Sequence, residues 1–279
     1  MIVAYAMGGG LGHLRRARAV LDRLAPGSDR VFLTASRFAG GDGVIRVPRR
    51  LADFPAAFAR WLRQTLHSLR PEAVLVDAFP LGILGELADA SVLPDVPLWH
   101  SARLLRWDRY RAAFSGAPRR YDAVFAVEEP TPDHEVFLRA FSREFSRIDL
   151  AVEKTGNPRE KSDKQAPHWL VVHSGPAAEV HRLLEFASGS ERDLPVKPEF
   201  LVVSPRDISL PRGAARISHP RAWELFAHAG RIVTACGFNA MREAAPYAGK
   251  HLFLPFARRF DDQPLRAARR RRALAECAR

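Results

Sequence analysis

Residues 2–12, IVAYAMGGGLG, carry a short apolar run directly into a cluster of glycines. The run Ile2–Met7 has the length and apolar character of a buried strand. After the glycines, Leu14, Ala17 and Leu21 recur at helical spacing. A strand, a tight glycine turn and a helix in that order open a βαβ unit, so this stretch predicts an α/β fold with a parallel sheet.

The same alternation of strand and helix patterns continues along the chain. The arginines of the first predicted helix fall mostly on the face opposite its apolar residues, at Arg15, Arg16, Arg18 and Arg23. Further strands are predicted at Val31–Thr34, Val44–Val47, Ala73–Asp77, Val96–Trp99 and Ala123–Val127. Helical patterns separate several of them, at Ala52–Leu69, Gly82–Ala90 and Leu104–Phe114. Together they predict one doubly wound lobe over residues 1–155.

A second series begins after a polar, proline-containing linker, KTGNPREKSDKQAP at Lys154–Pro167. Its predicted strands are Trp169–Val172, Phe200–Val203, Ala215–Ser218, Ile232–Ala235 and His251–Pro255. Its predicted helices are one ending at Ala187 and others at Arg221–His228, Asn239–Tyr247 and Pro264–Cys277. The sequence therefore predicts a second lobe over residues 166–279. We expect two Rossmann-like lobes with parallel sheets facing across a cleft, and ligands beyond the carboxyl ends of the strands.

The composition is ordinary for a soluble globular protein. Its 279 residues suffice for two domains, and no apolar run approaches the length of about 20 residues that crosses a bilayer. The N-terminus lacks the basic region and cleavage site of a signal peptide. Two cysteines, Cys236 and Cys277, are too few for a disulfide framework or a cysteine zinc site. A bacterial, cytoplasmic enzyme is expected.

The formal charge of +12 has two interpretations. One is attraction to anions such as nucleotide phosphates, a lipid diphosphate or an acidic membrane face. The other, which we favour for the total, is a composition bias, because Arg far outnumbers Lys. The basic run Arg266–Arg279 is either a solvated helix face or a contact with phosphates at the inner membrane surface. Nucleic acid is not an expected partner, since no zinc finger, aromatic RNA motif or helix-turn-helix is recognisable.

The glycine turn ends in a histidine, GGGLGH at residues 8–13. Gly9, Gly10 and Gly12 let the backbone approach a ligand, and the start of the helix favours an anion. The turn is not the dinucleotide fingerprint, because His13 stands where G-x-G-x-x-G has its third glycine. An imidazole here can accept a proton from a hydroxyl near neutral pH; the alternative is that His13 only caps the helix.

A second strand–turn–helix pattern spans Ile232–Glu243, IVTACGFNAMRE. Gly237 and Asn239 begin the helix, and Glu243 follows one and a half turns later. Its carboxylate can accept both hydroxyls of a ribose. The alternative is an acidic residue favoured by the helix dipole.

A third pattern, PFARRFDDQ, follows the last predicted strand. Asp262 and Gln263 can bond sugar hydroxyls, and Arg258 or Arg259 can contact phosphates. Asp262 can equally be the N-cap of the last helix.

Taken together, these motifs resemble the MurG-like GT-B glycosyltransferases over nearly the whole chain. Residues 8–13 look like that family's first glycine loop with its histidine. Residues 77–82, beginning at Asp77, lie where the family has a second loop beside the acceptor. Ser174 and Gly175 are placed like its third loop, which holds the donor diphosphate. Gly237, Glu243, Asp262 and Gln263 have the spacing of its ribose and donor-sugar contacts.

The resemblance implies a metal-independent, inverting transfer of a sugar from a nucleotide-sugar, a UDP-sugar above all, with His13 as the base. No metal site or cofactor is expected, and the sequence has no D-x-D triplet. The acceptor stays open between a lipid-linked and a small molecule. The chain is also similar to the UDP-sugar hydrolase of pseudaminic acid biosynthesis, in which water replaces the acceptor. A non-catalytic nucleotide-sugar-binding subunit is the third alternative, because the third loop has a single glycine.

Overall fold

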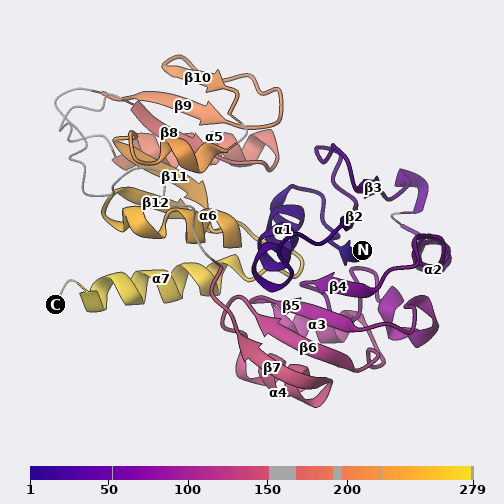
Figure 1. Ribbon diagram of the computed structural model, residues 1–279. Coiled ribbons are helices and arrows are strands. Elements are labelled where there is room, and N and C mark those ends of the chain that lie inside the picture. The colour runs from indigo at the N-terminus through magenta and orange to yellow at the C-terminus, as the bar shows by residue number, and fades with distance from the viewer. Residues whose placement is uncertain (52, 151–167, 191–196, 220, 278–279) are drawn as a thin grey trace. The chain divides into compact units, whose positions relative to one another are not determined.

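The chain forms two compact units in the computed structural model (Figure 1). The first is Met1–Ala151 together with Arg259–Asp261, and the second is Val152–Arg258 together with Asp262–Arg279. The structure describes all residues except 52, 151–167, 191–196, 220 and 278–279. The predicted linker at Lys154–Pro167 therefore lies outside the described residues.

The first unit is a parallel sheet with α-helices between some of its successive strands. Its strands are β1 (Ile2–Tyr5), β2 (Arg30–Thr34), β3 (Val44–Arg46), β4 (Ala73–Asp77), β5 (Leu98–Ala102), β6 (Tyr121–Ala126) and β7 (Ser142–Arg147). Its helices are α1 (Gly12–Leu24), α2 (Pro55–Leu69), α3 (Trp107–Ala113) and α4 (Pro132–Ala140). The strand order is β3-β2-β1-β4-β5-β6-β7.

The second unit repeats this design on a smaller scale. Its strands are β8 (His168–Val172), β9 (Glu199–Val203), β10 (Ala214–Ile217), β11 (Arg231–Ala235) and β12 (His251–Leu254). Its helices are α5 (Ala177–Ser190), α6 (Phe238–Glu243) and α7 (Gln263–Cys277). The order is β10-β9-β8-β11-β12, and the paired strands of both sheets run parallel. Two Rossmann-like units with parallel sheets are confirmed.

Each sheet reverses its direction of growth at one point. The chain builds outward from β1 to β3 and then returns to place β4 on the other side of β1; β8 and β11 have the same relation. At such a switch point the loops after the two central strands diverge and leave room for a ligand. Each unit is therefore expected to bind a ligand at these loops, which follow β1 and β4 in the first unit and β8 and β11 in the second.

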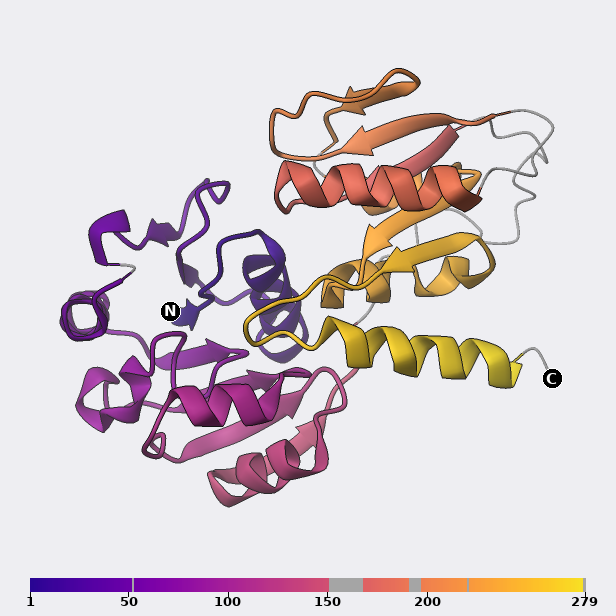
Figure 2. The ribbon, with the colours of Figure 1, turned by 180° about the vertical axis from the view of Figure 1, so that it is seen from behind.

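Both faces of the second sheet are buried, which explains the continuous apolar runs in its strands. Trp169 and Val171 of β8 pack against α5, whereas Leu170, between them, packs against Phe226 on the opposite face. This is the two-residue alternation of a strand. Figure 2 shows α5 lying along one face of this sheet.

One predicted helix is wrong: Gly82–Ala90 is a loop with a short 3₁₀ turn at Glu86–Ala88, and a second such turn begins at its last residue, Ala90. Gly82 and Gly85 have positive φ angles of 85° and 84°, which an α-helix does not accommodate. A Cβ at Gly82 would lie 2.4 Å from the Glu86 carboxyl group. Glu86 in turn accepts hydrogen bonds from the Tyr5 hydroxyl and the Leu84 amide. The loop is fixed by these buried polar contacts rather than by helical periodicity.

The predicted helices at Arg221–His228 and Asn239–Tyr247 are shorter than expected. The first is a 3₁₀ segment, Ala222–Leu225, and the second ends as an α-helix at Glu243, followed by a 3₁₀ segment. Pro246 lies in that segment, and a proline supplies no amide hydrogen to continue the α-helix.

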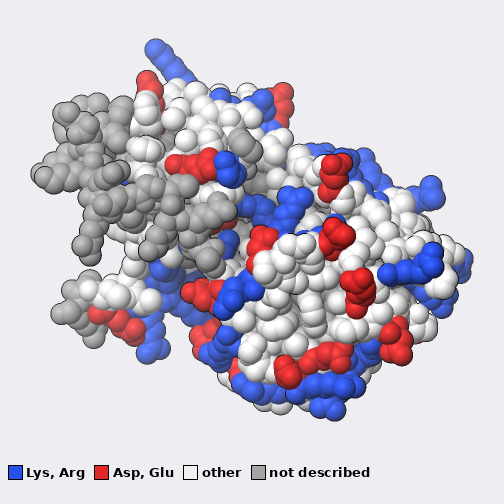
Figure 3. Space-filling view, viewed as in Figure 1, with Lys and Arg blue, Asp and Glu red and all other residues white. Residues whose placement is uncertain are grey.

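Strand β7 was not predicted from the sequence, because this edge strand is mostly polar. Arg143 lies 3.4 Å from Asp122, and Arg147 pairs with Glu135 of α4 at 2.8 Å. Figure 3 shows acidic and basic side chains interleaved over this part of the first unit. Charged side chains on an edge strand discourage pairing with another chain, so the polar pattern hid a genuine strand.

Two histidines are buried in the first unit in neutral form. His134 stacks on Trp107 with ring centroids 4.1 Å apart, and neither of its ring nitrogens has a hydrogen-bond partner among the described residues. His100 donates from Nδ1 to the Val76 carbonyl at 2.9 Å. Burial lowers the pKa of His134 to about 3 and that of His100 to about 4. Neither ring takes up the second proton that would make it an imidazolium at neutral pH.

Stability is therefore expected to fall as the pH drops from about 6.5 to about 4. In this window the unfolded chain protonates both histidines while the folded chain does not. Each contributes a loss of about 1.4 kcal/mol per pH unit. Urea unfolding at pH 7 and pH 5 measures the slope. His134→Phe keeps the ring stack and should reduce the slope, whereas a change at the exposed His67 should not; an unchanged slope in His134→Phe contradicts the assignment.

Candidate functional site

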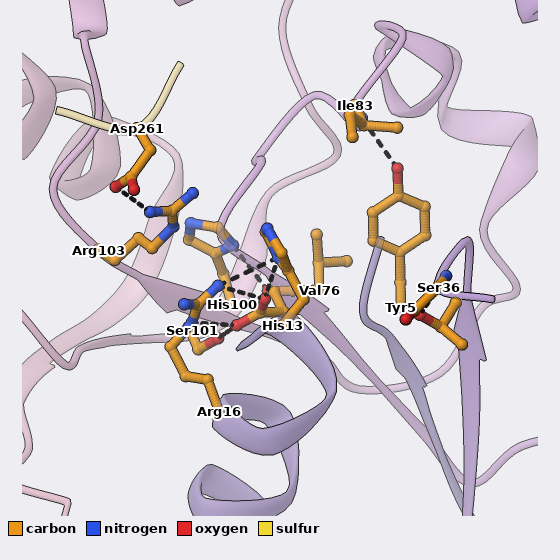
Figure 4. A network of polar contacts seen from close by, with 12 residues as sticks. Tyr5, His13, Arg16, Ser36, Val76, Ile83, His100, Ser101, Arg103 and Asp261 are labelled. Carbon is orange, nitrogen blue, oxygen red and sulfur yellow. Dashed lines mark hydrogen bonds and ion pairs between the residues drawn. The ribbon is translucent and has the colours of Figure 1, made fainter. Parts of the chain in front are cut away.

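A buried carboxylate at the end of β4 collects three side chains in the first unit. His13 Nδ1 lies 2.7 Å from Asp77 Oδ2, and Ser101 donates from Oγ to Asp77 Oδ1 at 2.7 Å. Arg16 donates from Nε to Oδ1 at 2.7 Å and from Nη2 to Oδ2 at 2.6 Å. Figure 4 shows the side chains of His13, Arg16 and Ser101 converging there. The structure thus joins the loops on both sides of the switch point.

The contact with Asp77 fixes the tautomer of His13. An ionised carboxylate only accepts hydrogen bonds, so Nδ1 carries the ring proton. Nε2 then holds the lone pair and is the atom that can accept a proton from a ligand. The His13 side chain keeps 15% of its surface exposed while Asp77 has none. The pair therefore has the layout of a general base held by a carboxylate.

The surroundings keep the dyad in the charge state that a base requires. Burial lowers the pKa of His13 to about 4; the bond to Asp77 opposes this shift and the charge of Arg16 adds to it. Burial alone would raise the pKa of Asp77, but the Arg16 guanidinium and His13 outweigh it and hold that pKa well below its usual range. At neutral pH the imidazole is uncharged and the carboxylate ionised.

Two residues beside the dyad constrain the ring and the chain. Phe79 lies against His13 with ring centroids 5.3 Å apart. Ala78, which follows the carboxylate, has a φ of 69°, a left-handed value that is strained for a residue with a side chain. Its amide donates to the Ser101 carbonyl at 2.9 Å. This hydrogen bond fixes the backbone directly after Asp77, the last residue of β4.

The glycine that His13 needs is Gly8, at the start of the cluster. A Cβ there would lie 2.2 Å from His13 Cδ2, whereas a Cβ at Gly9 would meet nothing within 4 Å. Gly12 is the first residue of α1. The absent side chain at Gly8 thus sets the position of the imidazole, which the glycine pattern alone did not single out.

Replacing Gly8 with alanine is expected to displace the His13 ring and to destabilise the protein by about 1–3 kcal/mol through overpacking. Gly9→Ala is the matched control and should leave both unchanged. Thermal unfolding and the NMR chemical shifts of the His13 ring measure the two effects. Equal behaviour of the two variants would contradict the packing role of Gly8.

A second buried ion pair lies close to this network. Arg103, which follows β5, pairs with Asp261 and covers the Phe79 ring with its guanidinium 5.8 Å from the ring centroid. Phe260 packs edge-on against Phe79 and Tyr110, with ring centroids 6.0 and 5.2 Å apart. Phe260 thus extends the cluster of aromatic rings that contacts His13 through Phe79.

The second unit gathers charged side chains at its own switch point, after β8. His173 Nε2 lies 2.7 Å from Glu179 Oε2, and Arg258 grips both carboxylate oxygens of Glu179. A Cβ at Gly175 would lie 2.2 Å from His173 Nε2 and 2.8 Å from Glu179 Oε2. Gly175 is therefore required by the packing of His173 and Glu179 around it.

Arginines surround the predicted phosphate loop. Ser174 is exposed, and its backbone carbonyl accepts a hydrogen bond from Arg206 Nε at 3.3 Å. Burial lowers the pKa of His173, and the charges of Arg258 and Arg206 lower it further while Glu179 opposes them. Two guanidinium groups thus lie near the start of α5, and that of Arg258 is paired with the Glu179 carboxylate. The helix start itself favours an anion.

Gly237, Asn239 and Glu243 lie on one short helix at the other side of this switch point. Gly237 is the N-cap of α6, and Asn239 and Glu243 are both buried. Arg242 Nη2 lies 3.8 Å from Glu243 Oε1. A ribose role for Glu243 stays a prediction, as do the roles of the other two residues.

Asp262 and Gln263 make structural contacts inside the second unit. Asp262 Oδ1 accepts from the Leu265 amide at 3.0 Å, so this residue caps α7, the alternative that the sequence left open. Gln263 is buried, and its Oε1 accepts from the Phe256 amide at 3.0 Å. These bonds account for both residues without a ligand, and their predicted contacts with a sugar stay predictions.

The arginines of α7 partly serve its own packing. Arg266 is buried and donates to the Cys236 carbonyl at 2.8 Å, Arg270 donates to the Ala245 carbonyl at 3.2 Å, and Arg272 pairs with Glu276 at 2.8 Å. Among the described helices, none is long and apolar enough to cross a membrane. Contact with a membrane surface stays a prediction.

Sequence reasoning missed Arg16 as a site residue, because it assigned the arginines of the first helix mostly to the solvent face. Arg16 is 2% exposed. The signal was its spacing: residues three apart share a helix face, so a residue three after His13 points the same way. Ser101 and Glu179 were also missed, and nothing in their local patterns marks them.

Comparisons with solved structures show the same fold at low identity. The spinosyn rhamnosyltransferase SpnG complexed with thymidine diphosphate matches 91% of this chain and 86% of its own, with a TM-score of 0.50 and 14% identity. UDP-N-acetylglucosamine 2-epimerase from Rickettsia bellii matches 95% and 81%, with a TM-score of 0.52 and 13% identity. Sucrose-phosphate synthase from Thermosynechococcus elongatus matches 99% and 90%, with a TM-score of 0.51 and 13% identity.

No protein-family model matches the sequence, and neither does any curated protein. The likeness in structure concerns the fold, which many activities can share. This chain therefore has the two-unit Rossmann-like fold of the GT-B glycosyltransferases and of the UDP-N-acetylglucosamine 2-epimerases.

Proposed function

We propose that this protein is a glycosyltransferase that moves a sugar from a nucleoside diphosphate sugar to a hydroxyl group. The observation that carries the proposal is the His13–Asp77 dyad at the switch point of the first unit. It offers a neutral imidazole nitrogen to an acceptor hydroxyl, in a fold that SpnG and sucrose-phosphate synthase also have.

In the proposed reaction the acceptor oxygen attacks the anomeric carbon while its proton passes to His13 Nε2. The bond from the anomeric carbon to the diphosphate oxygen breaks, and the nucleoside diphosphate leaves with the electron pair. Attack from the side opposite the leaving group inverts the anomeric centre. Asp77 stabilises the imidazolium that forms, as a carboxylate does in a catalytic triad.

Positive charge on the departing diphosphate is proposed to come from the second unit. The loop Ser174–Gly175 lies at the start of α5, with Arg206 bonded to it and Arg258 bonded to Glu179 of the same helix. Fixed dipoles and guanidinium groups stabilise a leaving phosphate without rearranging during the reaction. Glu243 is proposed to hold the ribose. UDP and TDP are the first nucleotides to test, since SpnG is complexed with thymidine diphosphate.

A binding screen followed by a turnover assay tests the proposal. A nucleoside diphosphate that binds the folded state should raise the free energy of unfolding, by about 2.7 kcal/mol when its free concentration is 100 times Kd. Thermal shift with UDP, TDP, GDP and CMP finds the nucleotide. Release of the nucleotide from the matching sugar donors is then measured with and without added alcohols.

The outcomes separate the alternatives. Release that requires an alcohol supports a transferase, and rapid release in water alone supports a hydrolase of the same fold. Tight binding without turnover of any donor indicates a binding subunit. Absence of both binding and turnover across the four nucleotides and their sugars contradicts the proposal.

A further inference from the structure

With the buried Arg16 of α1, the Asp77 carboxylate has a contact at each of its hydrogen-bonding positions. Asp77 Oδ1 accepts from Arg16 Nε and Ser101 Oγ, while Oδ2 contacts Arg16 Nη2 and His13 Nδ1. An ionised carboxylate has about four lone-pair positions, so these four contacts fill it. The carboxylate can neither rotate nor admit a water without losing a bond.

Such an arrangement matters because the carboxylate, besides stabilising the imidazolium formed in the reaction, also raises the proton affinity of the resting imidazole. An aspartate beside a histidine attracts a proton to the ring, and a protonated ring cannot accept one from an acceptor. A guanidinium on the same carboxylate competes for that negative charge. Arg16 Nη2 also lies 3.1 Å from His13 Nδ1, so its positive charge directly opposes protonation of the ring.

The charged and titratable groups near His13 come from several elements. Arg16 belongs to its own helix, Asp77 ends β4, and Arg103 follows β5, where it pairs with Asp261. His100 of β5 is neutral and bonds the Val76 carbonyl. Arg16 is the cation that bonds Asp77 directly, and its fork geometry matches a carboxylate as an ammonium group does not.

We infer that Arg16 is a positioning residue for the base: it holds the carboxylate that orients His13 and keeps the imidazole uncharged until the acceptor gives up its proton. The inference rests on the proposed role of His13 as base. A purely structural alternative is that Arg16 only ties α1 to β4. The two differ in what they predict for the protonation of His13.

Titration of the His13 ring by NMR tests this without any substrate, so its result stands even if the sugar chemistry is wrong. The samples are histidine-labelled wild type, Arg16→Met and Arg16→Lys, with His13→Gln to assign the signal. Arg23→Met is the matched control, because Arg23 is exposed in the last turn of the same helix. Thermal unfolding of each variant reports stability separately.

In Arg16→Met the midpoint of the His13 titration should rise by about one pH unit or more, a tenfold gain in proton affinity. Arg16→Lys should stay near the wild-type midpoint because the charge remains. If donor turnover is established, the Lys variant should lose about tenfold in kcat with little change in KM, since one ammonium group cannot bridge both oxygens. Arg23→Met should match wild type throughout.

A midpoint in Arg16→Met equal to that of wild type, with lowered stability, makes Arg16 a structural tie and overturns the inference. If the Met variant does not fold, Arg16→Lys decides the matter. A Lys variant whose ring titration moves upward as far as one pH unit contradicts the charge role. Unchanged turnover in that variant contradicts the alignment role.

Discussion

Replacing His13 with alanine is expected to lower the turnover number for sugar transfer by about 10²- to 10⁴-fold, the usual contribution of a positioned general base. The ring is the proposed proton acceptor, and Asp77 cannot replace it because that carboxylate is fully buried and already bonded on both oxygens. Donor binding should change little, since the nucleotide is proposed to bind the second unit. Steady-state kinetics with saturating donor measure the effect.

The pH dependence of the proposed reaction in the wild-type protein tests the same residue independently. Because the pKa of His13 is lowered to about 4, kcat/KM should stay level from neutral pH down to about pH 5 and fall below it. His67→Ala, an exposed histidine on α2, is the control. Near-normal turnover in His13→Ala, with the fold intact by circular dichroism, removes the base assignment.

Asp77→Asn is expected to lower the free energy of unfolding by about 3–5 kcal/mol, the cost of breaking a buried ion pair by neutralising one partner. The amide cannot accept the two bonds of Arg16 and those of His13 and Ser101 at once. A buried guanidinium is left without its counter-charge. Urea unfolding at pH 7 measures the loss, and the double variant Arg16→Met with Asp77→Asn should recover part of it.

Asp22→Asn is the matched control for this loss. Asp22 also pairs with an arginine, Arg30, on the same unit, but its side chain is 68% exposed. Exposed pairs contribute about 0–1 kcal/mol. Similar losses in the two variants would mean that burial of Asp77 does not set its contribution.

The fold could be predicted from the sequence because its signals are local. Apolar runs of strand length, each followed by a turn and an amphipathic helix, specify βαβ units whatever the rest of the chain does. Where the prediction failed, long-range contacts outweighed the local pattern. Gly82–Ala90 has helical periodicity, but buried hydrogen bonds to the Tyr5 and Tyr110 hydroxyls hold it as a loop.

The candidate site was only partly predictable. His13 and Asp77 were both singled out, but from separate motifs 64 positions apart. Their pairing depends on the strand order that places β4 beside β1, which no local pattern contains. Arg16 was hidden for a different reason: arginine is usually exposed, and only a buried counter-charge makes an inward position favourable.

Residues 259–261 make the first unit discontinuous in sequence, which the strand order alone does not indicate. They belong to the first unit although the chain on either side of them belongs to the second. A fragment of residues 1–150 would contain β1–β7 but lack the Phe260 ring beside Tyr110 and the counter-ion of Arg103. A chimera that takes its first unit from this protein and its second unit from a relative must therefore also keep residues 259–261 of this protein. A single junction near residue 151 would replace these three residues with those of the relative.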